Sequence, residues 1–397
     1  MTHDVAIPDH VPHPVVVDFD IFNPPDLKKG VHEAWLALHR SNGSDVLWTP
    51  RNGGHWILNN GALVPQFYAD FEHFSSRNEF LPRSTANSIP ASLDPPEHTK
   101  FRRIINTILS PKIVGSMNAE IQSRTIELVE GLAPKNKCDF VGDFALKLPL
   151  ELFMNWANLP TEDIPKLRYF VERTMRPSDG VTALEAMDAL MSYLDPYLHA
   201  RRAEPGRDLL SLAVTGELDA RKITHDEARR MCGQFLIAGL DTVAAMLSFI
   251  FLYMARHSEI RARLREEEDL LSGAVEEFLR RFPIVSPVRE VVTDFPCDGV
   301  TLRRGDLIVI PTLLHGLDPQ IFPDPEAVDP RRKPQTTSTF GQGPHRCPGS
   351  MLARTELRTV LREWLRRIPD FTVEDESAIV FRAGIVGSIA HLPLRWS

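Results

Sequence analysis

The sequence predicts a mainly α-helical fold with a smaller β part. Between residues 95 and 280, apolar residues recur at intervals of three and four, as in EHTKFRRIINTIL and EIQSRTIELVEGL, which is typical of amphipathic helices. Short β-like pieces separated by turn residues occupy residues 1–75 and the stretch after residue 280. No repeat, linker or low-complexity segment divides the chain, so we expect one domain spanning residues 1–397.

The strands are expected in three places. DVLWTP and HWILNN flank an NGG turn at 52–54 and predict a hairpin. REVVTDFP and VTLRRGDLIVIP predict further strands after residue 280, and AGIVGSIAHLPLRW predicts a terminal hairpin. The last long helix is expected in SMLARTELRTVLREWLRRI, after a proline-rich irregular stretch.

Residues 234–255, QFLIAGLDTVAAMLSFIFLYMA, are long and apolar enough to span a bilayer. Asp241 near the centre would cost about 2.5–3.5 kcal/mol there, and both flanks are charged. We therefore expect a buried core helix and no membrane association. Thr224 and Glu227 form a T-x-x-E capping box, so the helix is predicted to begin there and to run to about His257.

Composition narrows the class of protein. The chain is 43% hydrophobic and 25% charged, with a formal net charge of -8, which argues against nucleic acid as the main partner. The four cysteines are scattered without a CxxC pair, at 138, 232, 297 and 347. This disfavours a disulfide framework or structural zinc and, with no signal-peptide run at the N-terminus, predicts a cytoplasmic protein.

The segment FGQGPHRCPG, residues 340–349, surrounds Cys347 with glycines, His345 and Arg346 just before a helix. A helix N-terminus favours thiolate over thiol, and glycines allow the backbone to approach a flat group closely. Such a loop suits a haem iron and its propionates. The alternative is an inert buried thiol, the usual state of a free cysteine.

The pattern F-x-x-G-x-x-x-C-x-G, with Phe340, Gly343, Cys347 and Gly349, resembles the haem-ligand signature of cytochromes P-450. The resemblance runs from about residue 74 onward. SIPASLDPPEH, AGLDTV, EEFLRRF and LREWLRRIPDF are similar to the soluble bacterial group that hydroxylates camphor. The resemblance implies the cytochrome P-450 fold, with haem b between the long central helix and the helix after the cysteine loop. Cys347 would be the iron ligand.

AGLDT, residues 238–242, lies in the middle of the long helix. Alone, such a threonine bonds back to the carbonyl four residues earlier, and the aspartate finds a salt bridge. The resemblance implies catalytic roles. Thr242 would hold an ordered water by hydrogen bonds beside dioxygen, Asp241 would relay protons from solvent, and Gly239 would leave room for dioxygen.

Glu277 and Arg280 are three apart on a predicted helix and can pair. Alone they are an ordinary surface pair, whereas the resemblance implies a structural brace. The usual third partner aligns with Ala327, so we expect only two side chains in it. The resemblance also assigns haem propionate binding to His98, Arg102, Arg289 and His345, which are otherwise solvated charges.

No flavin or iron–sulfur domain is visible, so the resemblance implies a two-iron ferredoxin served by a flavoprotein reductase, with the enzyme expected as a monomer. A basic patch that steers an acidic ferredoxin is one hypothesis and a solvated face the other. The patch would comprise Lys100, Arg102, Arg103, Arg332, Lys333 and Arg346. Glu72 stands where the related group has a basic residue.

The substrate loop is expected between residues 74 and 94. It lacks the tyrosine by which the camphor enzyme bonds a ketone, since no tyrosine lies between Tyr68 and Tyr169. We therefore expect a small apolar terpenoid or norisoprenoid, such as an ionone, with residues 170–202 as a lid. The predicted pocket residues are Phe80, Ala86, Ile89, Ala91, Ile237, Ala238, Val285, Val288, Ile385 and Val386, with one hydrogen bond from Thr85, Asn87 or Ser88.

Three functions compete. The first is a ferredoxin-dependent monooxygenase, with camphor or another monoterpenoid as the alternative substrate. The second is a peroxygenase or isomerase that needs no ferredoxin, and the third is a gas-binding haem protein. The intact Asp241–Thr242 pair favours the first, because peroxide-using enzymes tend to lose this pair and a gas-binding protein has no use for it.

Overall fold

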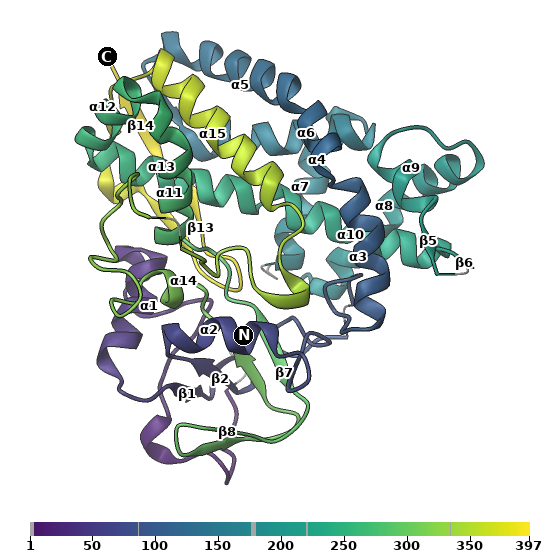
Figure 1. Cartoon of the computed structure of the whole chain (residues 1–397), viewed down its shortest axis with the longest axis vertical. Coiled ribbons are helices and arrows are strands. Elements are labelled where there is room, and N and C mark those ends of the chain that lie inside the picture. The colour runs from purple at the N-terminus through teal and green to yellow at the C-terminus, as the bar shows by residue number, and fades with distance from the viewer. Residues whose placement is uncertain (1–3, 86, 176–179, 220, 334) are drawn as a thin grey trace.

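Helices form the larger part of the molecule, and the main sheet lies at one end, drawn at the bottom of Figure 1. The computed structural model describes residues 4–85, 87–175, 180–219, 221–333 and 335–397. The expectation of a mainly α fold with a smaller β part is confirmed.

The helices have the following bounds: α1 (Val31–Ser41), α2 (Val64–Ala69), α3 (Glu97–Ile108), α4 (Pro111–Ser116), α5 (Asn118–Leu132), α6 (Lys147–Ala157), α7 (Ile164–Met175), α8 (Ala183–Ala203), α9 (Leu209–Val214), α10 (His225–Leu240), α11 (Thr242–Arg256), α12 (Ser258–Glu266), α13 (Leu271–Arg281), α14 (Leu313–Gly316) and α15 (Ser350–Arg367). Both amphipathic segments singled out in the sequence are helices, α3 and α5.

The strands are β1 (Val46–Thr49), β2 (His55–Leu58), β3 (Phe74–Ser75), β4 (Lys137–Asp139), β5 (Glu217–Leu218), β6 (Arg221–Lys222), β7 (Val288–Val291), β8 (Phe295–Cys297), β9 (Val300–Leu302), β10 (Leu307–Val309), β11 (Phe371–Val373), β12 (Val380–Arg382), β13 (Ser388–His391) and β14 (Pro393–Trp396). The main sheet has the order β1-β2-β10-β7-β3. Its β1–β2 hairpin turns at the predicted NGG segment, and only the β10–β2 pairing is parallel.

The predicted terminal hairpin is wrong. β13 pairs with β12, whereas β14 pairs with β11 and β4 in another sheet. Only Leu392 separates β13 from β14. A hairpin needs a loop of about two residues, so one residue cannot reverse the chain, and it passes from one sheet to the next instead.

The long central helix is present but broken at Asp241, between α10 and α11. Its start is the predicted capping box: the Glu227 amide donates to Thr224 Oγ1 at 3.2 Å, and the Thr224 amide donates to Glu227 Oε2 at 2.8 Å. The stretch His225–Arg256 is apolar and long enough to cross a membrane, yet 67% of its apolar window is buried inside the protein. It is therefore a core helix, as expected.

Two hydrophobic clusters meet at this break. Buried residues of α10 pack with α3, α6, α8 and α9, whereas those of α11 pack with α13, α15 and the C-terminal strands. The break thus places residues 238–242 between the two clusters.

Candidate haem site

The cysteine loop is a tight turn packed on α2. The Cys347 amide donates to the Phe340 carbonyl at 2.7 Å, which closes the loop. Gly341 and Gly343 have φ values of 70° and 62°. A Cβ on Gly341 would lie 2.7 Å from the Tyr68 ring, and one on Gly343 would lie 2.8 Å from the Ala69 Cα. Glycine is therefore required at both positions, by the backbone conformation and by the closeness of α2.

The Cys347 thiol is governed by two opposing influences. Burial raises its pKa, while the Gly349 amide, which donates to the sulfur, and three guanidinium groups favour the thiolate. These groups belong to Arg102, Arg354 and Arg346. Burial prevails for the free thiol, contrary to the expected thiolate, but a coordinated metal ion deprotonates a thiol outright.

Four basic side chains converge beside this loop. The His98 and His345 rings lie 4.1 Å apart between centroids, and Arg289 lies with its guanidinium 5.0 Å from the centre of the Tyr68 ring. Arg102 Nη2 donates to the Arg346 carbonyl at 2.6 Å.

The electrostatics of this group point to an anionic ligand. Burial, then the neighbouring arginines, lower the pKa of His98 to about 4, and burial, Arg289 and His98 lower the pKa of His345 to about 2. His98 Nδ1 is buried and has no hydrogen-bond partner among the residues described. An anion would stabilise the Arg102 and Arg289 cations and supply the missing partner of His98.

The break in the central helix centres on Thr242. Its Oγ1 donates to the Ala238 carbonyl at 2.8 Å, competing for the oxygen that a regular helix offers to the Thr242 amide. Asp241 has φ of -102° and ψ of -31° and lines a cavity that also includes Arg168, Glu172 and Arg382. A Cβ on Gly239 would meet Phe153 at an ordinary 3.8 Å, so no contact among the described residues demands glycine there.

Glu277 and Arg280 form a buried bidentate ion pair with N–O distances of 2.8 and 3.0 Å, and their side chains are 6% and 2% exposed. The remaining Arg280 donors are taken by the carbonyl oxygens of Gly316, Pro325 and Ala327, at 2.6–2.7 Å. All five N–H donors of Arg280 are therefore hydrogen-bonded, which is a condition under which a buried ion pair persists.

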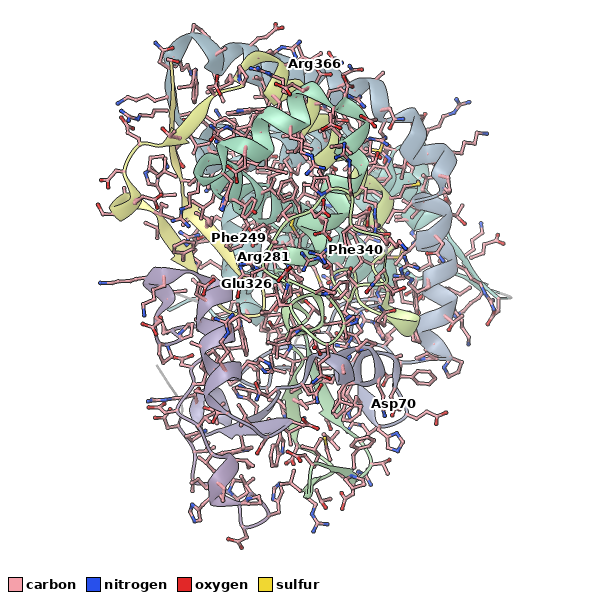
Figure 2. All side chains as sticks on the ribbon, turned by 60° about the vertical axis from the view of Figure 1, so that its left-hand side comes forward. Asp70, Phe249, Arg281, Glu326, Phe340 and Arg366 are labelled. Carbon is pink, nitrogen blue, oxygen red and sulfur yellow. The ribbon has the colours of Figure 1, made fainter. Side chains whose placement is uncertain are left out.

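The expectation of a two-residue brace is wrong. Ala327 contributes its carbonyl, and Arg332 Nε donates to Glu277 Oε2 at 3.0 Å as a third side chain. Arg332 is 15% exposed and so does not belong to a surface patch, against the prediction. Beside the brace, Arg281 Nε donates to the Glu326 carbonyl at 3.0 Å, and Figure 2 shows these two residues next to each other.

Comparison with known proteins decides the family. Residues 164–378 match the model described as Cytochrome P450. The chain belongs to the cytochrome P450 family. It is 31% identical over 402 residues to the "Probable cytochrome P450 127A1" of Sinorhizobium fredii (98% of this chain, 97% of that protein), and 31% identical to the "Nocardicin C N-oxygenase" of Nocardia uniformis (92% and 96%).

Two solved cytochromes P450 resemble the whole fold. CYP101J2 has a TM-score of 0.91 at 39% identity, and CYP101C1 has 0.90 at 40%; each comparison covers 99% of this chain and 100% of the other. Both belong to the camphor-type CYP101 group, which confirms the predicted relation. The P450 family implies a haem cofactor and monooxygenase chemistry.

The side chains present fit a haem. The P450's Cys347 lies in a loop kept thin by glycine, and the unpaired nitrogen of His98 with the converging cations suits two propionates.

Of the predicted ferredoxin patch, Arg103, Lys333 and Arg346 are exposed. Lys100 and Arg103 are engaged with acidic neighbours: Lys100 with Glu97 and Asp219, and Arg103 with Asp219. Glu72 is also exposed.

The predicted pocket residues fall into two groups. Phe80, Ile89 and Ile237 pack in the α10 cluster, whereas Val288, Ile385 and Val386, with Val285 packed against them, belong to the α11 cluster. Val285 and Val386 are bridged to each other. Ala238 is exposed and Ala91 half-buried, and Ala86 lies outside the described residues.

The polar candidates of the substrate loop are partly engaged. The Ser88 hydroxyl donates to Glu79, and Asn87 Oδ1 accepts from Arg230 at 3.4 Å, while Thr85 is exposed. Sequence reasoning missed Glu79 and Glu290, the carboxylates that hold this loop. The one signal was a glutamate inside the apolar strand segment VREVV, directly after Arg289.

Proposed function

We propose that this P450 inserts one oxygen atom into a C–H bond of a small apolar terpenoid or norisoprenoid, such as an ionone-like ketone. It would act as a cytoplasmic monomer of one domain, residues 1–397. Electrons would come from a two-iron ferredoxin and its flavoprotein reductase. The observation that carries the monooxygenase assignment is the break at Asp241–Thr242, which sets an acid and a hydroxyl at the junction of the two core clusters.

The chain's side chains divide the binding work. Cys347 would hold the iron, with Phe340 and Gly349 shaping its loop. Arg102, Arg289, His98 and His345 would bind the propionates. The haem, when bound, supplies the iron at which dioxygen is activated. Glu277, Arg280 and Arg332 would keep α13 and the segment before the cysteine loop together.

Proton delivery is assigned to the central helix. Thr242 Oγ1 already donates its proton to Ala238, so its lone pairs remain to accept a hydrogen bond from water. The Asp241 carboxyl lines a cavity between α7 and α11 and would pass protons from that side.

The substrate class is supported by the lining and the relatives. The predicted pocket side chains described here are hydrocarbon, and a hydrocarbon pocket discriminates by shape and area. The camphor-type relation favours a compact terpenoid, whereas the lack of a loop tyrosine argues against camphor's carbonyl contact.

Spectral titration of the haem-loaded oxidised protein tests the proposal. We expect α-ionone to produce a low-to-high-spin shift at lower concentration than camphor, and the ferredoxin system to convert it to a hydroxylated product. Tighter binding of camphor would favour the camphor or monoterpenoid alternative. Turnover with peroxide but not with ferredoxin would favour the peroxygenase reading.

A further inference from the structure

Beyond β3, the described residues of the substrate loop form no helix or strand. Between Ser76 and Pro96, the described residues form only turns, bends and irregular backbone. Such a segment loses its shape readily unless side chains hold it, because backbone ordering costs about 1–2 kcal/mol per residue. The contacts that restrain this loop therefore decide how well the pocket is formed before a substrate arrives.

Glu290 of β7 gathers three of these contacts. Its side chain is 5% exposed and accepts hydrogen bonds from Arg77, Asn78 and Arg83, the last at 2.8 Å. Arg83 also donates to the Gly305 carbonyl at 2.6 Å, at the turn between β9 and β10. One carboxylate thus ties the first part of the loop to the main sheet.

The position of Glu290 in β7 directs its side chain toward the substrate loop. Side chains alternate along a strand, so Glu290 and Arg289 point to opposite faces of the sheet. Arg289 turns toward Tyr68 and the cysteine loop, and Glu290 toward the substrate loop. Ser75, the residue from which the loop departs, is the cross-strand neighbour of Glu290.

Two inner carboxylates complete the restraint. Glu79 accepts from the hydroxyls of Ser88 and Ser92, and Asp94 accepts from the Ser75 hydroxyl and, at 2.9 Å, from the Ser76 amide. Phe80 follows Glu79, and Ile89 follows Ser88. Both are buried in the cluster that contains Ile237.

The charge of the Glu290 carboxylate strengthens its hydrogen bonds to the loop. Burial alone would raise the pKa of the Glu290 carboxyl, but the hydrogen bonds from Arg77 and Arg83 outweigh it and lower the pKa. The carboxylate is therefore ionised, and its bonds to the two guanidiniums are charge-assisted. The arginines are 51% and 46% exposed, so water can solvate them when the carboxylate is removed.

We propose that Glu290 is a positioning residue for substrate binding, which holds residues 77–83 against β7 so that Phe80 and Ile89 stand in the pocket before the substrate binds. The proposal rests on the proposed function for the pocket itself. It assigns part of the enzyme's affinity to a carboxylate that never touches the substrate.

Hydrogen exchange of the haem-loaded protein without substrate tests the tie directly. In Glu290→Gln we expect amides of residues 77–85 and 87–93 to exchange about tenfold faster than in wild type, the effect of losing charge-assisted bonds on local opening. Glu376→Gln is the matched control, since Glu376 is an exposed carboxylate with a bidentate Arg256 partner elsewhere on the surface. It should leave those amides unchanged.

Ligand binding gives the second readout. The Kd of α-ionone from the spin shift should rise about tenfold in Glu290→Gln, with the loss in kcat/KM carried by KM. Arg83→Met should reproduce part of this effect. The loss in the double variant should be smaller than the sum of the two single losses, because the two substitutions share the Glu290–Arg83 interaction.

Unchanged exchange in both Glu290→Gln and Arg83→Met would overturn the proposal, as would equal effects in Glu376→Gln. If Glu290→Gln fails to fold, the exposed Arg83→Met variant alone decides by the same exchange measurement. A failure of the proposed function would appear separately: wild type would then lack the spin shift, whatever the loop exchange shows.

Discussion

At the scale of single residues, the site depends on side chains whose surroundings set their chemistry. Thr242 is one. If Thr242 has only a structural role, its hydroxyl does no more than donate a hydrogen bond to the Ala238 carbonyl, and that hydrogen bond is present. The same hydrogen bond, however, uses the hydroxyl proton and leaves the lone pairs of Thr242 Oγ1 to accept a hydrogen bond from water. Proton delivery needs such an acceptor, whereas a purely structural role does not.

Replacing Thr242 by Ala distinguishes a role in proton delivery from a purely structural role. We expect product formed per NADH to fall on the order of a hundredfold, with hydrogen peroxide released instead, because the hydrogen-bond acceptor that would hold the water for proton delivery is lost. Thr242→Ser, which keeps the hydroxyl, should retain most of the coupling. NADH, product and peroxide are measured together with the ferredoxin system; unchanged coupling in the alanine variant would remove the role given to Thr242.

Glu356 of α15 is a buried carboxyl whose Oε2 has no hydrogen-bond partner in the part of the chain that the structure describes. Burial raises its pKa to about 8. Between the ordinary glutamate pKa and about 8, the folded protein thus holds a proton that the unfolded chain has lost. Binding of this proton therefore contributes fully to the free energy of unfolding at low pH, and the contribution is lost as pH rises to about 8.

We therefore expect the free energy of unfolding of wild type, relative to Glu356→Gln, to fall with pH by at most about 1.4 kcal/mol per unit between pH 5 and 8. Denaturant unfolding of both haem-loaded proteins at several pH values gives this difference. A difference that stays constant or rises over the range would contradict the neutral carboxyl.

At the scale of elements, the cysteine loop and α2 fit each other closely. Gly341 combines a left-handed backbone with contact to the Tyr68 ring, whereas Gly299 in the β8–β9 turn has a similar φ of 76° and no atom within 4 Å of an added Cβ. Substitution at Gly299 therefore tests the cost of a positive φ alone, whereas substitution at Gly341 adds the cost of a steric clash with Tyr68.

Gly299→Ala should cost about 1 kcal/mol of unfolding free energy, the penalty of forcing φ positive. Gly341→Ala should cost more and lower the haem content per chain, because the methyl would displace Tyr68 and the loop that carries Cys347. Chemical denaturation and haem quantification check this pair. Equal losses and full haem content in both variants would show that α2 does not constrain the loop.

The same scale shows where local patterns suffice. The capping box at Thr224 and Glu227 predicted the start of α10 correctly, because the hydrogen bonds involved lie within four residues. The prediction of a terminal hairpin failed because β14 pairs with β11, which precedes the intervening β12 and β13, and with β4, in the first half of the chain. Strand pairing is non-local, so alternation alone cannot select the partner.

At the scale of the whole molecule, the sequence predicted the mainly α fold, the family and the haem cofactor, since these follow from periodicity and from spaced motifs around Cys347 and Asp241. It misjudged the brace, because the Arg332 side chain reaches Glu277 across an irregular stretch whose path no period reveals. It missed the restraint of the substrate loop for the same reason: Glu290 meets Arg77 and Arg83 across more than 200 residues.

The central claim is that Cys347 binds the haem iron as a thiolate, and the absorption spectrum of the reduced, carbon-monoxide-bound protein tests it most directly. We predict a Soret band at the long wavelength that thiolate ligation produces, and its loss in Cys347→His with haem still bound. A short-wavelength band in wild type, or no haem at all, would contradict the claim and the function built on it.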